Sequence, residues 1–214
     1  MQIKTFTFNP FGENTYILYD EHTLACMIVD PGCHNRAEEQ ELSAYISDYH
    51  LKPELLVNTH CHIDHIMGNG YVSSKYKLPL HMHKDEEKTM EHSKGWGKMY
   101  GLEIGPQPDE RIYINEGDEL KLGSYIFELL FTPGHSIASL SIYCKEAATL
   151  VAGDVLFRQG IGRYDLPGGD FEILEQSIKT KLYTLPDDTK LYPGHGEPTS
   201  IGFEKVNNPY VRLS

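Results

Sequence analysis

The sequence lacks long apolar runs, and it has no excess of basic side chains. No apolar stretch approaches the roughly 18 residues that a membrane-spanning helix needs. Residues 1–10 lack the charged and apolar regions of a secretory signal peptide. With 19 basic against 31 acidic residues, the formal net charge is −12, which repels the phosphates of nucleic acids. We therefore expect a cytoplasmic protein whose partners include neither a membrane nor a nucleic acid.

Cysteine is scarce, and repeats, low-complexity tracts and linkers are missing. The cysteines Cys26, Cys33, Cys61 and Cys144 include no close pair with the spacing of a metal finger or a redox motif. We interpret them as free thiols in a reducing compartment. The 214 residues suit one domain, and the 40% of apolar residues suffices for a substantial core.

The predicted elements form two strand-rich stretches, each followed by helical sequence. In the first stretch we expect strands at 4–8, 15–19, 24–29, 55–57 and 78–82, helices at 36–49, 68–77 and 84–94, and an irregular segment at 95–109. In the second we expect strands at 119–122, 125–131, 139–144 and 149–152, then a helix at 171–185 with Asp170 as its N-cap, and a short strand that runs to Tyr192. This order predicts an α+β fold with helices packed outside two sheets.

The run His60-Cys61-His62-Ile63-Asp64-His65 is the strongest chemical signal, because it places four candidate ligands in six residues after a predicted strand. Burying such polar groups without partners costs roughly 2–7 kcal/mol each, so a loop with coincidental histidines is the weaker interpretation. His60 and His62 stand two apart on an extended segment and point the same way, which leaves Cys61 facing away as a buried thiol. Imidazole and carboxylate ligands suit zinc, iron or manganese.

Three further candidates each follow a predicted strand. They are His135 in Thr132-Pro133-Gly134-His135, Asp154 in Gly153-Asp154, and His195 in Tyr192-Pro193-Gly194-His195-Gly196. Taken singly, each is compatible with an ordinary turn or strand end. A carboxylate at the end of a buried strand is nevertheless costly without a cation, and loops that follow different strands can converge.

The run His60-x-His62-x-Asp64-His65, followed by His135, Asp154 and His195, resembles the metallo-β-lactamase superfamily, and specifically its type II glyoxalase-like branch. The resemblance implies a four-layer αββα sandwich and two divalent metal ions, Zn²⁺ first, with iron or manganese as alternatives. It implies that one ion is held by His60, His62 and His135, the other by Asp64, His65 and His195, and that Asp154 bridges them.

Other residues narrow the branch. Asp154 argues against true β-lactamases, which lack an aspartate there, and His62 argues against flavodiiron proteins, which have a glutamate. Residues 154–170 and 193–210 resemble the compact hydroxyacylglutathione hydrolase-like enzymes, which lack the C-terminal helical domain of full-length type II glyoxalases. We therefore expect a single domain over 1–214, with 84–110 as a lid insertion.

The resemblance implies hydrolysis of a small-molecule thioester such as S-D-lactoylglutathione by a hydroxide that bridges the metals, with Asp64 and Asp154 as catalytic groups. A persulfide dioxygenase of the same branch, with one iron, is the alternative, because histidine and aspartate also suit non-haem iron. A non-catalytic scaffold is disfavoured because all seven ligands are present. A nuclease is disfavoured by the acidic charge. The oligomeric state stays open.

Three residues have candidate roles beside the ligands. Arg163 matches a basic residue through which full-length glyoxalase II binds glutathione, so it either binds an anionic substrate group or pairs with Asp165. Asp30 and Thr59 either orient ligand histidines or serve as a turn residue and a strand-end hydroxyl.

Two further groups of residues give weaker signals of a role near the metal site. Trp96, Met99 and Tyr100 either cover the metals as an apolar lid or pack against the domain. His81 and His83 either end a solvated strand or reach the edge of the pocket, and we expect His92 at the surface.

Overall fold

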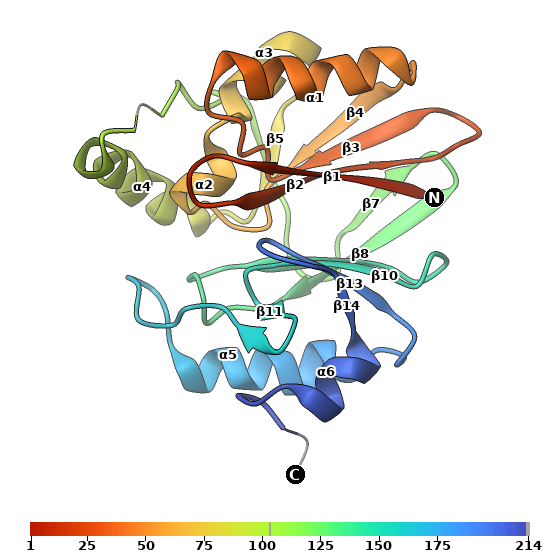
Figure 1. Cartoon of the computed structure of the whole chain (residues 1–214), viewed down its shortest axis with the longest axis vertical. Coiled ribbons are helices and arrows are strands. Elements are labelled where there is room, and N and C mark those ends of the chain that lie inside the picture. The colour runs from red at the N-terminus through yellow and green to blue at the C-terminus, as the bar shows by residue number, and fades with distance from the viewer. Residues whose placement is uncertain (103, 213–214) are drawn as a thin grey trace.

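Two six-stranded sheets lie face to face in the computed structural model, with helices on their outer faces (Figure 1). The structure describes residues 1–102 and 104–212, leaving aside the side chains of Lys98 and Tyr100. The first sheet has the order β1 (Gln2–Phe8), β2 (Glu13–Tyr19), β3 (Ala25–Val29), β4 (Lys52–Val57), β5 (Leu80–Met82) and β6 (Arg111–Tyr113). The second has the order β14 (Thr199–Ser200), β13 (Lys190–Pro193), β10 (Thr149–Gly153), β9 (Leu140–Cys144), β8 (Tyr125–Phe131) and β7 (Glu119–Leu122). A small hairpin, β11 (Leu156–Phe157) and β12 (Gly160–Ile161), follows β10.

Helices cover both outer faces. The first sheet is covered by α1 (Arg36–Asp48), α3 (Asn69–Tyr76) and α4 (Glu86–Tyr100), and α2 (Ile63–Ile66) is a single turn after β4. The second sheet is covered by α5 (Phe171–Ser177), a π-helical turn (Ile178–Leu182) and α6 (Ile201–Asn207). Asp170 caps α5 as predicted, because its side chain accepts a hydrogen bond from the Ile173 amide.

Three apolar cores explain the layering. The core between the sheets contains Tyr16, Met27, Phe127, Ile142 and Val151. The core under α1, α3 and α4 contains Ile28, Leu42, Ile46, Leu56, Val72 and Met90. The core under α5 and α6 contains Leu150, Leu174, Ile178, Leu191 and Ile201. Because each sheet buries both faces, β3 carries the continuous apolar sequence typical of such strands. The predicted α+β fold, a four-layer αββα sandwich, is confirmed.

The segment after Lys94 differs from the prediction. We expected irregular structure over 95–109, but α4 continues through Gly95 and Gly97 to Tyr100. A Cβ at Gly97 would lie 2.9 Å from the Leu102 carbonyl oxygen, so the close approach of the following loop requires glycine at this position of the helix. Strand β6 was not predicted either. Among residues 1–102 and 104–212, no helix is long and apolar enough to cross a membrane.

Candidate metal centre

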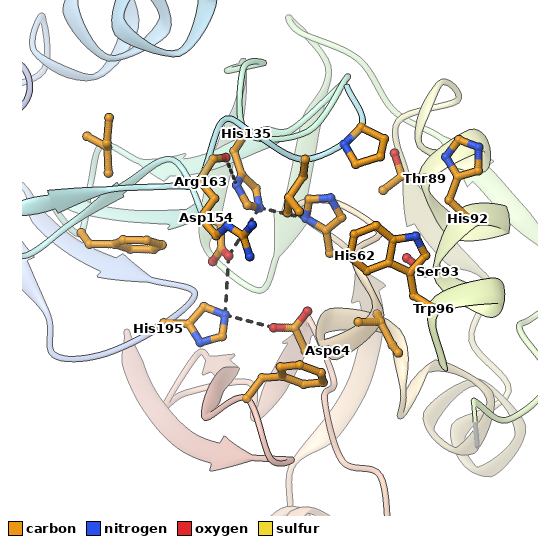
Figure 2. A pocket seen from close by; sticks show the side chains of 16 residues that line it. His62, Asp64, Thr89, His92, Ser93, Trp96, His135, Asp154, Arg163 and His195 are labelled. Carbon is orange, nitrogen blue, oxygen red and sulfur yellow. Dashed lines mark hydrogen bonds and ion pairs between the residues drawn. The ribbon is translucent and has the colours of Figure 1, made fainter. Parts of the chain in front are cut away.

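The candidate ligands gather at one site. His62, Asp64, His135, Asp154 and His195 line one pocket (Figure 2), and ligand atoms of His60 and His65 lie within 4.8 Å of those of other members of the set. His60 and His62 follow β4 of the first sheet, and Asp64 and His65 lie in the adjoining turn α2. The remaining candidates come from the second sheet, where His135 follows β8, Asp154 follows β10 and His195 follows β13. The site therefore spans the seam between the sheets.

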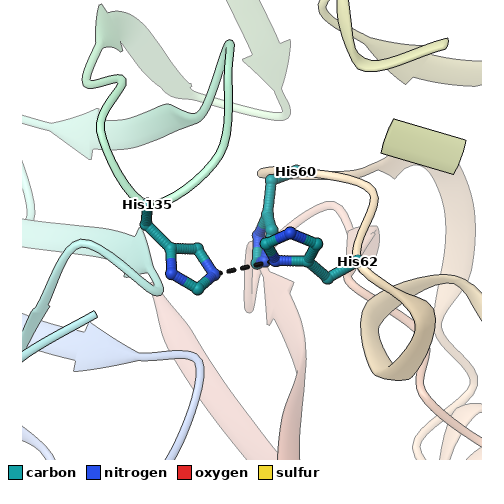
Figure 3. Close-up of side chains that lie close together, drawn as sticks. All are labelled: His60, His62 and His135. Carbon is teal, nitrogen blue, oxygen red and sulfur yellow. Dashed lines mark hydrogen bonds between the residues drawn. The ribbon is translucent and has the colours of Figure 1, made fainter. Parts of the chain in front are cut away.

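His60, His62 and His135 form the first trio (Figure 3). Their ligand nitrogens all lie within 4.8 Å of one another, and His62 Nδ1 is 2.9 Å from His135 Nε2. The Arg163 carbonyl oxygen can only accept, so the 2.7 Å contact with His135 Nδ1 assigns the hydrogen to that nitrogen. His135 Nε2 is then left with a lone pair facing the other two rings.

Asp64, His65 and His195 form the second trio, whose ligand atoms also lie within 4.8 Å of one another. His195 Nε2 is 3.1 Å from Asp64 Oδ2, and His65 Nε2 is 3.7 Å from the same oxygen. The backbone of Glu13 pairs with His195 as an isolated β-bridge, which fixes the last loop against β2.

Asp154 lies between the two trios. Its Oδ2 is 3.5 Å from His135 Nε2 and 3.5 Å from His195 Nε2, and its Oδ1 is 3.5 Å from His65 Nε2. Gly194 lets the chain approach this carboxylate, since a Cβ at Gly194 would lie 2.0 Å from Asp154 Oδ1. One carboxylate thus faces histidines of both trios.

Asp30 and Thr59 contact two of the histidines on their Nδ1 sides. Asp30 Oδ2 accepts hydrogen bonds from Thr59 Oγ1 at 2.5 Å and from His65 Nδ1 at 3.1 Å. Thr59 Oγ1 is also 3.1 Å from His60 Nδ1. With its own hydrogen donated to Asp30, this oxygen accepts from His60 Nδ1, so His60 Nε2 keeps its lone pair. The bond of His65 Nδ1 to Asp30 leaves His65 Nε2 directed at Asp64 and Asp154. The contacts are those expected of groups that orient ligands, and the roles themselves stay predictions.

The two trios differ in the direction of their pKa shifts. Burial lowers the pKa of His60 and His135, and it lowers that of His62 to about 3, so these rings stay neutral. Burial acts the same way on His65, but the charges of Asp64 and Asp154 outweigh it and raise the pKa. The pKa of His195 is also raised, because its hydrogen bond to Asp64 and the charge of Asp154 outweigh burial. The metal-free second trio is therefore an ion-pair network.

The donor set fits cations. Within the described part of the chain, the buried atoms His60 Nε2, His65 Nε2 and Asp154 Oδ1 have no hydrogen-bond partner. Buried polar atoms without partners are costly, and imidazole nitrogens with carboxylate oxygens are the ligands of zinc, iron and manganese. Asp30, His60 and His65 also lie close enough to form a third group, but hydrogen bonds to Thr59, Asn58 and His65 already occupy the Asp30 oxygens.

A cavity of about 310 Å³ opens over this site. Besides five of the candidate ligands, its lining includes Ile63, Thr89, His92, Ser93, Trp96, Phe157, Ile161, Arg163 and Leu166. Trp96 lies in the cavity wall, whereas Met99 is 71% exposed and the side chain of Tyr100 lies outside the described structure. Four lining residues belong to α4, but the role of 84–110 as a lid stays a prediction.

Arg163 lines the cavity and also binds Asp165, with Nε and Nη2 donating to its carboxylate at 3.0 and 2.9 Å. Both side chains are exposed, so the pair is held weakly. Pairing with Asp165 and access to a substrate are therefore compatible.

Three residues were missed or misjudged from the sequence. His92 is exposed as expected, but it also lines the cavity. The expectation of a solvated strand end is wrong for His81, which is buried because β5 lies between β4 and β6, with Nδ1 3.1 Å from the Leu56 carbonyl oxygen. Glu86 was given no role, yet it is fully buried beside two of the ligand loops. The buried position of Cys61 is confirmed.

The chain matches the model of the Metallo-beta-lactamase superfamily over residues 8–195 and belongs to that superfamily. Membership and the candidate ligand clusters support a metal-dependent hydrolase. The chain is 37% identical to the probable metallo-hydrolase YqgX of Bacillus subtilis, covering 99% of this chain and 98% of that protein. It is 33% identical to the hydroxyacylglutathione hydrolase GloC of Haemophilus influenzae, with the same coverage of both chains.

Solved structures show the same fold. The BLEG-1 B3 metallo-beta-lactamase gives a TM-score of 0.88 at 32% identity, covering 98% of this chain and 99% of that one. TTHA1623, crystallised in a di-iron-bound form, gives 0.86 at 32% identity, with 97% and 100% covered. ETHE1 from Myxococcus xanthus gives 0.79 at 26% identity, with 99% and 84% covered. The expected superfamily is therefore confirmed.

Proposed function

We propose that the chain is a dinuclear metal-dependent hydrolase that cleaves a thioester of the S-D-lactoylglutathione type. The proposal rests on the position of Asp154. Its carboxylate lies 3.5 Å from histidines of both trios, and its buried Oδ1 has no hydrogen-bond partner among the described residues. The similarity to GloC supports the substrate class.

In this proposal each trio holds one ion, Zn²⁺ first with iron or manganese as alternatives, and Asp154 contacts both. Two such ions supply a nucleophilic hydroxide near neutral pH and positive charge for the developing oxyanion. Asp64 Oδ2 lies 3.1 Å from His195 Nε2 and borders the cavity, so it can accept a hydrogen bond from the attacking water and orient it. A thiolate leaves without obligatory protonation, so the chain needs no dedicated general acid.

A mononuclear iron persulfide dioxygenase is the second candidate, favoured by the likeness to ETHE1. The metal content per purified chain, measured with two activity assays, separates the candidates. Two ions together with thioester cleavage support the hydrolase. One iron per chain together with oxygen uptake on glutathione persulfide would overturn it.

The role of Arg163 in substrate binding is part of the proposal. Arg163→Ala should raise the KM of an anionic glutathione thioester by about tenfold and leave that of an uncharged thioester unchanged, because a charged hydrogen bond is lost only with the former. An equal rise for both substrates would argue against recognition of an anion.

A further inference from the structure

Glu86 lies in the first turn of α4 with its side chain fully buried. Its Oε2 accepts a hydrogen bond from the Cys61 amide at 2.8 Å. Its Oε1 accepts one from the Ala138 amide at 2.9 Å and another from the Ser136 hydroxyl. The carboxyl group of Glu86 accepts all three bonds. Hydrogen bonds to an ionised carboxylate are stronger than bonds between neutral groups.

The donors belong to the two loops that carry the first trio. Cys61 stands between His60 and His62 in the loop after β4, whereas Ser136 directly follows His135 in the loop after β8. These strands lie in different sheets. A single carboxylate therefore joins, across the seam of the sandwich, the two loops whose His62 Nδ1 and His135 Nε2 approach to 2.9 Å.

A second residue of α4 completes the attachment. Ser93 Oγ donates to the Cys61 carbonyl oxygen at 2.9 Å. Ser93 follows Glu86 by seven residues, close to two helical turns, so both side chains project from the same face of α4. The amide and the carbonyl of Cys61 are thus both bound by one helix, which fixes the two peptide groups that join Cys61 to His60 and to His62.

The second trio is held by other groups. His65 Nδ1 donates to Asp30, and the His65 carbonyl oxygen accepts from Asn58 Nδ2 at 2.9 Å. The side-chain hydrogen bonds described for Glu86 end on the two loops of the first trio, and none of them is made to Asp64, His65 or His195.

We propose that Glu86 is a positioning residue for the first of the two metal sites: it fixes the distance between the loop of His60 and His62 and the loop of His135. The proposal rests on the dinuclear centre proposed above. A glutamine here has the same shape but presents an NH₂ group where one oxygen accepts, so an amide donor of one loop loses its partner and faces another donor. The loops then move apart, and the ion between them is held less tightly.

The test is chelator competition on protein loaded with Zn²⁺, with each released ion counted. Glu86→Gln should lower the affinity of one ion by about 10- to 100-fold, the usual effect of removing a group that orients ligands, and leave the other within about twofold. The weakened ion is assigned with two further variants: it is the ion lost in His135→Ala and kept in His195→Ala. Glu87→Gln is the matched control. Glu87 is the next residue of α4 and also has a carboxylate side chain, but it binds Arg111 and Tyr113 and contacts neither ligand loop in the bonds described.

Equal weakening of both ions, or no weakening in a folded Glu86→Gln protein, would overturn the proposal. Should Glu86→Gln fail to fold, Ser136→Ala removes one of the three bonds and must give a smaller loss at the same single site. Glu86→Asp, which keeps the charge, should recover part of the affinity. The chelator measurement needs no thioester. A protein that binds two ions but cleaves no thioester would refute the proposed function, and the role of Glu86 at the first metal site could still be tested.

Discussion

Gly194→Ala is expected to disable the centre by displacing Asp154. An ideal Cβ at position 194 lies 2.0 Å from Asp154 Oδ1 and 2.8 Å from His65 Cε1. Ordinary contact begins near 3.4 Å, so the carboxylate oxygen has to move by about 1.4 Å. The backbone cannot yield instead, because the Gly194 amide donates to the Gly153 carbonyl at 2.8 Å and its own carbonyl accepts from the Asn14 amide at 2.7 Å.

A displacement of this size at a group that faces both trios should lower kcat by about 100-fold, since errors near 1 Å in catalytic positioning have that effect. The added methyl group should also cost roughly 1–3 kcal/mol of unfolding free energy through overpacking. Metal content per chain, thioester hydrolysis and urea denaturation are the three measurements.

Gly105→Ala is the matched control, because a Cβ there meets no described heavy atom within 4 Å, and it should behave as the unaltered protein. If Gly194→Ala kept two ions and full turnover while Gly105→Ala behaved as expected, the placement of Asp154 between the trios would be wrong.

Three further perturbations test the centre. Asp154→Ala should abolish the pairing of the ions and lower turnover by about a thousandfold or more, because bridging and charge stabilisation are lost together; two ions with normal turnover would refute the bridging role. Metal uptake near pH 7 should release protons, and affinity should rise with pH, because the raised pKa values of His65 and His195 keep these rings protonated until an ion replaces the proton. Calorimetry in buffers of different ionisation enthalpy counts those protons, and a count of zero contradicts the reasoning. Asp30→Ala should lower the unfolding free energy of the metal-free protein by about 3 kcal/mol in urea denaturation, because the Thr59 amide, the Thr59 hydroxyl and His65 Nδ1 lose their acceptor. A loss below about 0.5 kcal/mol would show that these bonds contribute little to stability.

The sequence predicted the assembly of the site because its signals are local. His60, His62, Asp64 and His65 lie within six residues, and His135 closely follows the predicted strand at 125–131. Strand ends at one edge of a sandwich bring such loops together, so the gathering of the candidates follows from the order of elements.

Burial that depends on distant contacts could not be predicted. Glu86 stands in the charged run Lys84-Asp85-Glu86-Glu87, where the neighbouring side chains are exposed or half-buried. Only the packing of α4 onto residues 61 and 138 decides which carboxylate turns inward, and no periodicity in the sequence encodes that contact.

The course of α4 beyond Lys94 was hidden for a related reason. Two glycines at 95 and 97 lower the intrinsic helix propensity by about 1 kcal/mol each relative to alanine, which argues against a helix. The structure keeps the helix because the loop at Leu102 and Ile104 packs closely on Gly97, and this tertiary contact outweighs the local preference.

The position of His195 after β13 has a consequence for biosynthesis. A ribosome that has released β4, β8 and β10 has delivered the first trio and Asp154, but the second trio lacks His195 until β13 has followed. Loading of the proposed second ion therefore cannot begin before His195 has been synthesised, whereas the three histidines of the proposed first ion are all present once His135 has followed β8.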